Sequence, residues 1–254
     1  MVEHEKMKVE ETTAVIDAQG LHHRVLNGLI KKAVFEGAKK LRILNVHGQR
    51  YIGAGLSHGV EVEIHGTPGG DLASFMGGSR ITVYGNVEDG CGNTMAGGEV
   101  VVHGHAGDIV GYAMRGGRIF IRGCVGYRAA IHMKGFQERK PVLVVGGNAG
   151  DFLGEYMAGG VIVLLRLNGS GEREGKANFL GTGMHGGTIY LRGEISGLNN
   201  HVRSVEMNGE DLRLLRELVE KFSRHFGYDT DRILKDGFTK LIPAARRPYH
   251  EHYS

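Results

Sequence analysis

Three sets of residues have types and spacings that could support chemistry. The string GTGMHG, Gly181 to Gly186, satisfies the GxGxxG pattern of dinucleotide-binding loops. Fourteen histidines and two cysteines offer metal ligands and nucleophiles. Asp89 and Asp108 are 19 residues apart and could pair their carboxylates to share a proton or bind calcium. Each reading depends on the elements that would position these side chains.

Methionine positions reveal an internal repeat that supplies those elements. Methionines recur at an interval of 19 and then at longer intervals: Met76, Met95, Met114, Met133, Met157 and Met184. The surrounding pattern is [Asp/Asn]-x-x-Gly-x-x-Met-x-Gly-Gly, and its clearest copies begin at Asp89, Asp108, Asp151 and Asn178. Ala54, Ser57 and Gly59 place a first copy one period before Met76. The sequence therefore predicts seven coils.

A short alternating strand follows each glycine pair. The strands are EVEI (61–64), RITV (80–83), EVVV (99–102), RIFI (118–121) and TIYL (188–191). No helical pattern of 10 to 12 residues separates them, which excludes a βαβ sheet for residues 50–195. We expect an all-β solenoid, a parallel β-helix of about seven coils whose strands stack at about 4.8 Å. The 43 glycines and only 4 prolines fit its tight corners and exclude collagen.

Stacking assigns the strand residues to faces. Two apolar columns should point inward: Val62, Ile81, Val100, Ile119, Val142, Ile162, Ile189 and Ile64, Val83, Val102, Ile121, Val144, Leu164, Leu191. The methionines should also lie inside. The outer column between them is polar at Glu63 and Thr82 and then apolar at Val101, Phe120, Leu143, Val163 and Tyr190. A flanking helix or a partner should cover it. The column Glu61, Arg80, Glu99, Arg118 predicts an exposed ladder of opposite charges.

This architecture favours structural interpretations of the reactive residues. Gly181 and Gly186 fall where other coils have Gly154 and Gly159, and a strand follows them, so we interpret GTGMHG as a solenoid turn. His65 and His103 share a column but are two coils apart, about 10 Å, too far for one zinc ion. His58 and His185 are six coils apart, about 29 Å.

The remaining candidates also have structural interpretations. His103 and His105 have no ligand set at zinc spacing, and Cys91 and Cys124 occupy different repeat positions. Asp89 and Asp108 should accept hydrogen bonds from backbone amides two residues on, before each corner. We therefore predict no catalytic, cofactor-binding or metal-ligating residues in this chain.

The flanks have helical patterns. Residues 20–38 predict a helix and LRILNV (41–46) a strand, and Asn208 should cap a helix that ends at Gly227. The expected units are an N-terminal helix and strand cap at 1–48, the β-helix at 49–200, and a C-terminal helical cap and tail at 201–254. A formal charge of +3 gives no reason to expect nucleic acid, and no apolar run approaches the roughly 20 residues of a membrane span. Two cysteines and the polar opening MVEHEKMKVEE predict a cytoplasmic chain.

The repeat, with DAQGLHHRVLN (17–27) and LRILNVHG (41–48) before it, resembles the GXGXG domain that closes the large subunit of glutamate synthase. It is also similar to the solenoid-forming subunit of formylmethanofuran dehydrogenase. The resemblance covers residues 14–200 and implies a right-handed β-helix without catalytic residues, here in a stand-alone form. The polar insertion at 166–178 and the segment beyond 200 depart from the family pattern, and we expect the insertion to contact a partner.

The resemblance implies a non-catalytic scaffold subunit of a glutamate synthase-like complex. In such a complex the amide nitrogen of glutamine is released on an amidotransferase-like subunit and used for reductive amination of 2-oxoglutarate on an FMN synthase-like subunit. FMN and an iron-sulfur cluster would be bound by these partners, because this chain opens with Met1 and Val2 instead of a catalytic cysteine and has only two cysteines. Three alternatives stay open: a scaffold of formylmethanofuran dehydrogenase or methylglutamate synthase, an independent small-molecule enzyme using a solenoid groove, and self-association through the apolar outer column.

Overall fold

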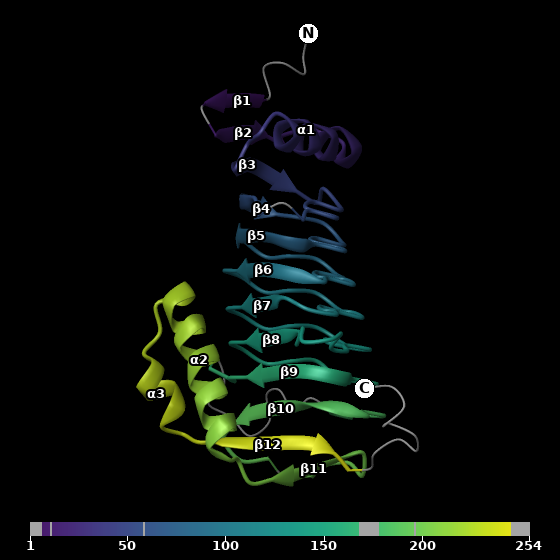
Figure 1. Cartoon of the computed structure of the whole chain (residues 1–254), viewed down its shortest axis with the longest axis vertical. Helices are drawn as coiled ribbons and strands as arrows, with labels where there is room; N and C mark the ends of the chain where they lie inside the picture. The colour runs from purple at the N-terminus through teal and green to yellow at the C-terminus, as the bar shows by residue number, and fades with distance from the viewer. Residues whose placement is uncertain (1–6, 11, 58, 168–177, 196, 245–254) are drawn as a thin grey trace.

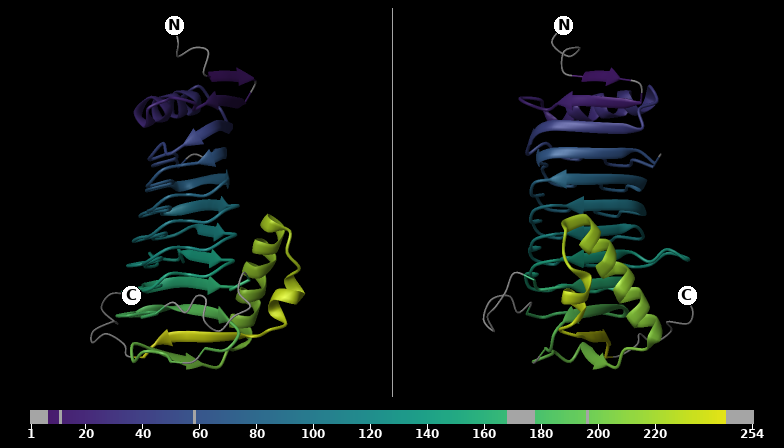
Figure 2. Two further views of the ribbon diagram at one scale, coloured as in Figure 1. Left: turned by 180° about the vertical axis from the view of Figure 1, so that it is seen from behind. Right: turned by 90° about the vertical axis from the view of Figure 1, so that its left-hand side faces the viewer.

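The structure is a computed structural model that describes residues 7–10, 12–57, 59–167, 178–195 and 197–244. The chain forms an elongated stack of strands with one helix at the N-terminal end and others along one side (Figures 1 and 2). Within these residues, twelve strands make one sheet in the order β1-β2-β3-β4-β5-β6-β7-β8-β9-β10-β12-β11. The strands are β1 (Met7–Glu10), β2 (Thr13–Asp17), β3 (Lys40–His47), β4 (Glu61–Thr67), β5 (Gly77–Tyr84), β6 (Gly97–Val102), β7 (Arg118–Ile121), β8 (Val142–Val145), β9 (Ala158–Leu164), β10 (Gly186–Arg192), β11 (Val202–Val205) and β12 (Phe238–Pro243). The helices are α1 (His23–Phe35), α2 (Gly209–Phe226) and α3 (Thr230–Leu234).

Strands β3 to β10 pair in parallel, each with the next one along the chain. Parallel neighbours require a connection that returns to the start of the strand, and seven such connections link these eight strands. The register aligns Ile81 with Val62 on one side and with Val100 on the other, as the column assignment predicts. The all-β solenoid is confirmed.

The repeat methionines fill the solenoid, as predicted. Met76, Met95, Met114, Met133, Met157 and Met184 are all buried, with exposed fractions of 0–3%. They belong to one apolar cluster that runs from Ala14 to Leu241. Unbranched thioether side chains can fill the irregular space opposite the strands, so they contribute to the core and not to a metal site.

One coil is shifted by a residue relative to the sequence prediction. The sequence places Val142 and Val144 inside and Leu143 outside, but Leu143 pairs with Ile119 and joins the interior cluster, whereas Val142 and Val144 lie on the outer face. The prediction is wrong because residues 134–140 lengthen this coil. All four residues of β8 are apolar and buried, so their alternation does not reveal the phase.

Backbone conformations alternate through each corner. φ is 73° at Gly92 and 53° at Thr94, both left-handed. The N–H of Gly92 donates to Leu72 O of the preceding coil (2.8 Å), and that of Thr94 donates to Tyr112 O of the following coil (2.8 Å). This corner therefore bonds to both neighbouring coils through left-handed conformations that glycine adopts most easily, which accounts for Gly92.

Close packing also selects glycine at the start of the strands. At Gly117, where φ is 80°, an added Cβ would lie 2.6 Å from Met95 Cε and 2.9 Å from Gly97 C. Backbone conformation and lack of space both exclude a side chain there.

The first corner differs from the predicted one by a residue. The sequence places Ala54 and Ser57 at the repeat positions, but Gly53 (φ 73°) and the buried Leu56 occupy them, and the N–H of Gly77 donates to Leu56 O. This prediction is wrong because the coil holds one additional residue between its corner and β4.

The N-terminal helix α1 forms within the predicted span 20–38. His22 caps it by accepting a hydrogen bond from Arg24 N at Nδ1. Leu26, Ile30 and Ala33 are buried in the interior cluster, so the helix closes the first coil. Beyond it, β2 pairs in parallel with β3 and β1 pairs antiparallel with β2, an extension that the sequence reasoning did not predict.

Helix α2 begins and ends at the predicted residues. The side chain of Asn208 accepts hydrogen bonds from Glu210 N and Asp211 N, and Asp211 Oδ2 accepts from Asn208 N (2.8 Å), which completes a capping box. Gly227 ends the helix with φ 75°. The helix lies along the outer face of the lower strands (Figure 2).

The chain then returns to the sheet. Strand β12 pairs antiparallel with β10, and β11 pairs antiparallel with β12. The predicted C-terminal helical cap at 201–254 therefore contains strands as well as helices. Most of the insertion and of the tail, residues 168–177 and 245–254, lies outside the described residues. No helix in the described part of the chain is long and apolar enough to cross a bilayer.

Candidate functional site

The string that matches a dinucleotide loop forms a solenoid corner. Gly181 and Gly183 are left-handed, with φ of 62° and 65°, and the N–H of Gly181 donates to Leu153 O of the preceding coil (2.8 Å). An added Cβ at Gly183 would lie 2.5 Å from the ring of Tyr156, which covers it. Strand β10 follows directly, so the corner lacks the helix whose N-terminus would bind a pyrophosphate. The interpretation of GTGMHG as a turn is confirmed.

The histidine column is an aromatic stack. The ring of Tyr84 stacks between those of His65 and His103, with centroid distances of 4.9 Å to His65 and 4.8 Å to His103. Phe226 of α2 packs edge-on against His103, with the ring centroids 5.2 Å apart. Burial and the charges of Arg122 and His225 lower the pKa of His103. Within the described ranges, which omit His58, no three His, Cys, Asp or Glu side chains gather as metal ligands.

His105 and Cys124 take part in a ladder of side chain to backbone hydrogen bonds. In this ladder each side chain accepts a hydrogen bond from the backbone N–H of the equivalent residue in the next coil. Asn86 Oδ1 accepts from His105 N (2.8 Å), His105 Nδ1 from Cys124 N (3.0 Å), and Cys124 Sγ from Asn148 N (3.3 Å). Since Nδ1 of His105 is an acceptor, the proton of the neutral ring is on Nε2. These side chains stabilise the stacking of coils.

The aspartates form a second ladder of the same kind. Asp89 Oδ1 accepts from Asp108 N (2.8 Å), and Asp108 Oδ1 accepts from Tyr127 N (2.7 Å). Asp151 Oδ1 repeats this with Asn178 N (2.9 Å). The predicted bond to an amide two residues on is wrong, because the equivalent residue of the next coil is in position to donate. Each of these carboxylates uses one oxygen to join neighbouring coils, which is a structural role.

Cys91 lies in the core of the same corners. Its thiol is fully buried, and burial raises its pKa to about 12. The thiolate is the reactive form of cysteine, so burial of the thiol disfavours reaction of Cys91 in the folded chain.

Helix α2 covers the apolar outer column. Phe120, Val163 and Tyr190 form a second cluster with Leu218 and Phe222 of the helix, separate from the solenoid interior. The sequence allowed a helix or a partner as cover, and the structure has the helix. The column on which self-association was expected is therefore buried by the chain itself.

A buried polar triad fixes the start of α2 on the sheet. Tyr190 Oη donates to Asp211 Oδ1 (2.6 Å), and Lys240 Nζ of β12 donates to Asp211 Oδ2 (2.7 Å). Burial opposes ionisation of Asp211, but the hydrogen bonds from Lys240, Tyr190 and Asn208 N, with the Lys240 charge, lower its pKa. Burial and the bond to Asp211 raise the pKa of Tyr190. Both groups are held in one charge state at neutral pH.

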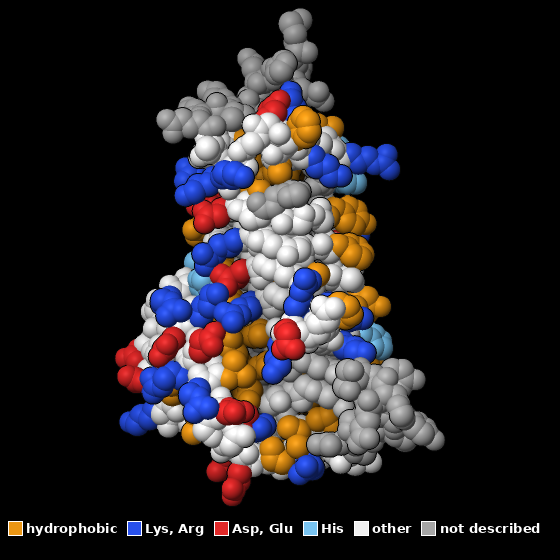
Figure 3. Space-filling view, viewed as in Figure 1, with side chains coloured by type: hydrophobic (Ala, Val, Ile, Leu, Met, Phe, Trp, Pro, Cys, Tyr) orange, Lys and Arg blue, Asp and Glu red, His pale blue; other side chains and the backbone are white. Residues whose placement is uncertain are grey.

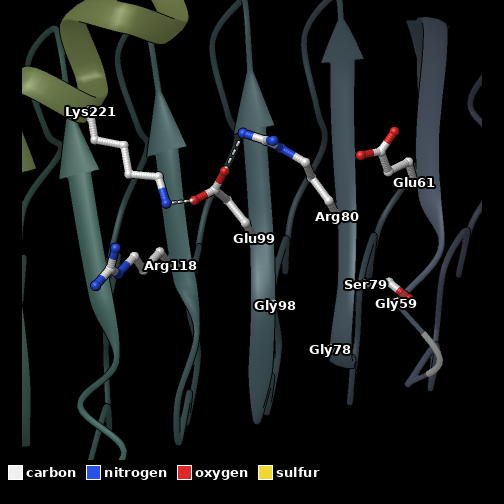
Figure 4. A pocket seen from close by; sticks show the side chains of 9 residues that line it. All are labelled: Gly59, Glu61, Gly78, Ser79, Arg80, Gly98, Glu99, Arg118 and Lys221. Carbon is white, nitrogen blue, oxygen red and sulfur yellow. Dashed lines mark hydrogen bonds and ion pairs between the residues drawn. The ribbon is translucent and has the colours of Figure 1, made fainter.

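The other end of α2 meets the sheet at a polar hollow, drawn in Figure 4. The hollow has a volume of about 450 Å³, and its lining residues are Gly59, Glu61, Gly78, Ser79, Arg80, Gly98, Glu99, Arg118 and Lys221. Glu99 of β6 bonds to Arg80 Nη2 (2.7 Å) and to Lys221 of α2, and His225 Nε2 lies 3.4 Å from its Oε1. Arg118 Nη2 pairs with Glu217 of α2 (3.2 Å).

This hollow is an ionic junction. Burial alone would raise the pKa of Glu99, but bonds from His225 and Lys221 and the charges of Lys221 and Arg80 lower it to about 2. A carboxylate that stays ionised at neutral pH is a poor general acid or base. Glu99 is also only 9% exposed, so the predicted solvent-exposed charge ladder is wrong at this coil, because α2 covers it.

Aromatic side chains gather at the corners, on the side opposite α2. We call this surface the corner ridge, and its rings are Tyr51, Phe75, Tyr112, Tyr127, His132, Phe152, Tyr156 and Phe179. Figure 3 shows hydrophobic side chains along this edge, at the right of the view. The sequence reasoning missed the ridge. Six of the eight rings occupy two repeat positions, five and one residues before the methionine (Leu56 in the first coil), as in Phe152 and Tyr156. Tyr112 and Tyr127 each lie one residue before these positions.

These observations define a repeat protein whose coils are joined by polar side chains and capped at both ends by its own helices and strands. The chain matches the GXGXG motif family over residues 40–244 and belongs to that family. It is similar to the uncharacterized protein MJ1350 of Methanocaldococcus jannaschii. The two are 43% identical over 252 residues, an alignment that covers 94% of this chain and 96% of the relative.

Proposed function

We propose that this chain is a scaffold subunit of a glutamate synthase-like complex. One observation carries the proposal: the family match spans residues 40–244, and that family resembles the domain that closes the large subunit of glutamate synthase. The chain would hold an amidotransferase-like subunit and an FMN synthase-like subunit together in the cytoplasm. FMN and the iron-sulfur cluster would belong to those partners.

The use of polar groups supports a structural role. The aspartates and the His105 series bond coil to coil, and Glu99 and Asp211 fix α2 to the sheet. Parallel strands in consecutive register leave little freedom for bending between coils. A frame of this kind suits the positioning of two active sites at a fixed separation.

A first experiment tests the partners. We would tag the full chain in its source organism, isolate it at low salt and identify the co-purifying proteins by mass spectrometry. The expected result is an amidotransferase-like and an FMN-binding subunit. Subunits of a formylmethanofuran dehydrogenase or methylglutamate synthase would select that alternative, and isolation without either set would contradict the scaffold proposal.

A second experiment tests the scaffold role by reconstitution. Glutaminase activity on one partner and ammonia-dependent reductive amination on the other should persist without this chain. Glutamine-dependent glutamate formation should require it, because nitrogen transfer needs the two sites to be joined. Equal rates with and without the chain would contradict the proposal. Turnover or cofactor absorbance of the chain alone would instead favour an independent enzyme.

A further inference from the structure

The corner ridge is an exposed aromatic surface with internal order. His132 and Tyr156 stack at 5.4 Å between ring centroids, and Phe152 and Phe179 stack at 4.8 Å. Phe75 is 63% exposed. From the first corner to the seventh there are six steps of about 4.8 Å, so the ridge is about 29 Å long. A contiguous apolar surface of this kind marks an interaction site.

Helix α2, which covers the apolar outer face of the sheet, does not reach the corner ridge. Helix α2 lies along the outer face of the sheet, and the corners project on the opposite side in both Figure 1 and Figure 2. Among the residues that the structure describes, none of α2 covers the ridge, so the ridge is available to contact another molecule.

Charged residues flank the ridge in a fixed order, because each coil crosses it in the same direction. The chain enters each corner at the repeat position six residues before the methionine. This position is acidic in three coils: Asp89, Asp108 and Asp151. Each uses Oδ1 for the ladder, which leaves Oδ2 outside it. At this position the first coil has Arg50, which pairs with Asp71 at 3.8 Å.

The other flank, where the chain leaves the corner, is basic. Arg115 and Lys134 occupy the position after the methionine in neighbouring coils. The inserted residues 134–140 form a short hairpin in which Phe136 and Arg139 exchange backbone hydrogen bonds (3.1 Å each). This hairpin carries the exposed Lys134, Glu138, Arg139 and Lys140, a net charge of +2, so the flank is basic overall. The surface thus has an acidic band, an aromatic centre and a basic band.

We propose that the corner ridge binds a second copy of this chain, with a two-fold axis parallel to the solenoid. A two-fold interface places the same patch of both copies face to face. With the axis along the ridge, the acidic band of each copy meets the basic band of the other, and the aromatic centres meet each other. An axis across the ridge would place like charges together. The banding therefore selects both the partner and its orientation, beyond any role in a larger complex.

The first test measures the oligomeric state of the full chain by sedimentation velocity over a concentration series. The wild type should be a dimer. Tyr156→Asn and Phe179→Asn together remove two rings from the ridge at left-handed positions that asparagine tolerates, and this variant should dissociate at least about tenfold more readily. A wild type that is monomeric up to about 100 µM overturns the proposal and leaves the ridge to a different subunit.

The second test reverses each band separately. Glu88 is exposed and adjoins Asp89. Glu88→Lys with Asp89→Asn, Asp108→Asn and Asp151→Asn leaves a positive charge on this flank and keeps Oδ1 as a ladder acceptor. Lys134→Glu with Arg139→Glu and Lys140→Glu makes the other flank acidic. Each variant alone should dimerise about 100-fold more weakly, because like charges then face each other. An equimolar mixture should form heterodimers, since the net charges of the facing bands are again opposite.

The controls separate association from folding. Arg213→Glu with Arg224→Glu changes exposed charges on α2, away from the ridge, and should leave the dimer intact. Circular dichroism of every variant should retain the strand signal. Dimers that are unaffected by the ridge and band variants, or band variants that do not associate when mixed, overturn the proposal.

Discussion

Glu99→Gln should loosen helix α2 while leaving the solenoid folded. The variant keeps the size of the side chain but removes the charge that binds Lys221 and Arg80. Lowering the pKa of Glu99 from 4.5 to about 2 corresponds to roughly 3 kcal/mol, at about 1.4 kcal/mol per pH unit. Because the hollow is open to water, solvent screens these charges and reduces their contribution. We expect Glu99→Gln to lower the free energy of unfolding by about 1–2 kcal/mol.

The same reasoning fixes the pH dependence. A carboxyl group whose pKa is lower in the folded chain stabilises it above the unfolded value of 4.5, and this stabilisation is lost as the pH falls from 4.5 towards 2. Glutamine does not ionise. The difference in stability between the wild type and Glu99→Gln should therefore be largest at neutral pH and disappear towards pH 2.

Hydrogen exchange followed by mass spectrometry measures this effect locally. Peptides of α2 should exchange about 5- to 30-fold faster in Glu99→Gln, whereas peptides of β4 to β7 should keep their protection. Glu217→Gln is the matched control, because Glu217 is 55% exposed in its pair with Arg118 and should contribute under about 1 kcal/mol. Equal exchange of α2 in wild type and Glu99→Gln, or a difference that does not change with pH, would refute the reasoning.

Three further predictions concern the two apolar clusters and the corners. Phe120→Ala should lower the free energy of unfolding by about 3–5 kcal/mol, because α2 packs over this outward-facing ring. Thr82→Ala, two coils earlier in the same column, should lower it by less than about 1 kcal/mol. Urea unfolding followed by circular dichroism compares the two variants, and equal losses would contradict the packing of α2 on Phe120. Gly117→Ala should lower the melting temperature, because φ is positive and there is no space for a Cβ. Gly28→Ala, inside α1 with open space around it, should raise the free energy of unfolding by about 0.5–1 kcal/mol. A lower melting temperature for Gly28→Ala than for Gly117→Ala in calorimetry would contradict these backbone conformations. Cys91 should resist iodoacetamide in the native chain at pH 8 and react after unfolding, as mass spectrometry of tryptic peptides would show; rapid native alkylation would contradict its burial.

Much of the fold could be predicted because equal repeats stack. A spacing of 19 residues places Val62, Ile81 and Val100 in one column without knowledge of any distant contact, and the structure aligns them. The capping residues Asn208 and Gly227 are equally local signals, since their hydrogen bonds and left-handed φ involve only neighbouring residues.

Predictions failed where the coil length changed or where partners came from other coils. The hairpin at 134–140 moved β8 by one residue, and VLVV has no polar member to reveal its phase. Asp89 was expected to bond within its own turn, but its partner is Asp108 N of the next coil. The hydrogen-bonding capacity of the side chain was clear from the sequence, but the donor was not.

The sequence by itself determined the repeat, the interior columns, the glycine corners and the absence of a helix after GTGMHG. These features depend on local period and backbone conformation, which each coil repeats. Only the tertiary structure decided that α2 and not a partner covers Phe120, that β12 returns to β10, and that aromatic corners align into a ridge between acidic and basic bands. Each of these depends on which distant segments pack together, because packing free energy comes from surfaces that meet only in the folded chain.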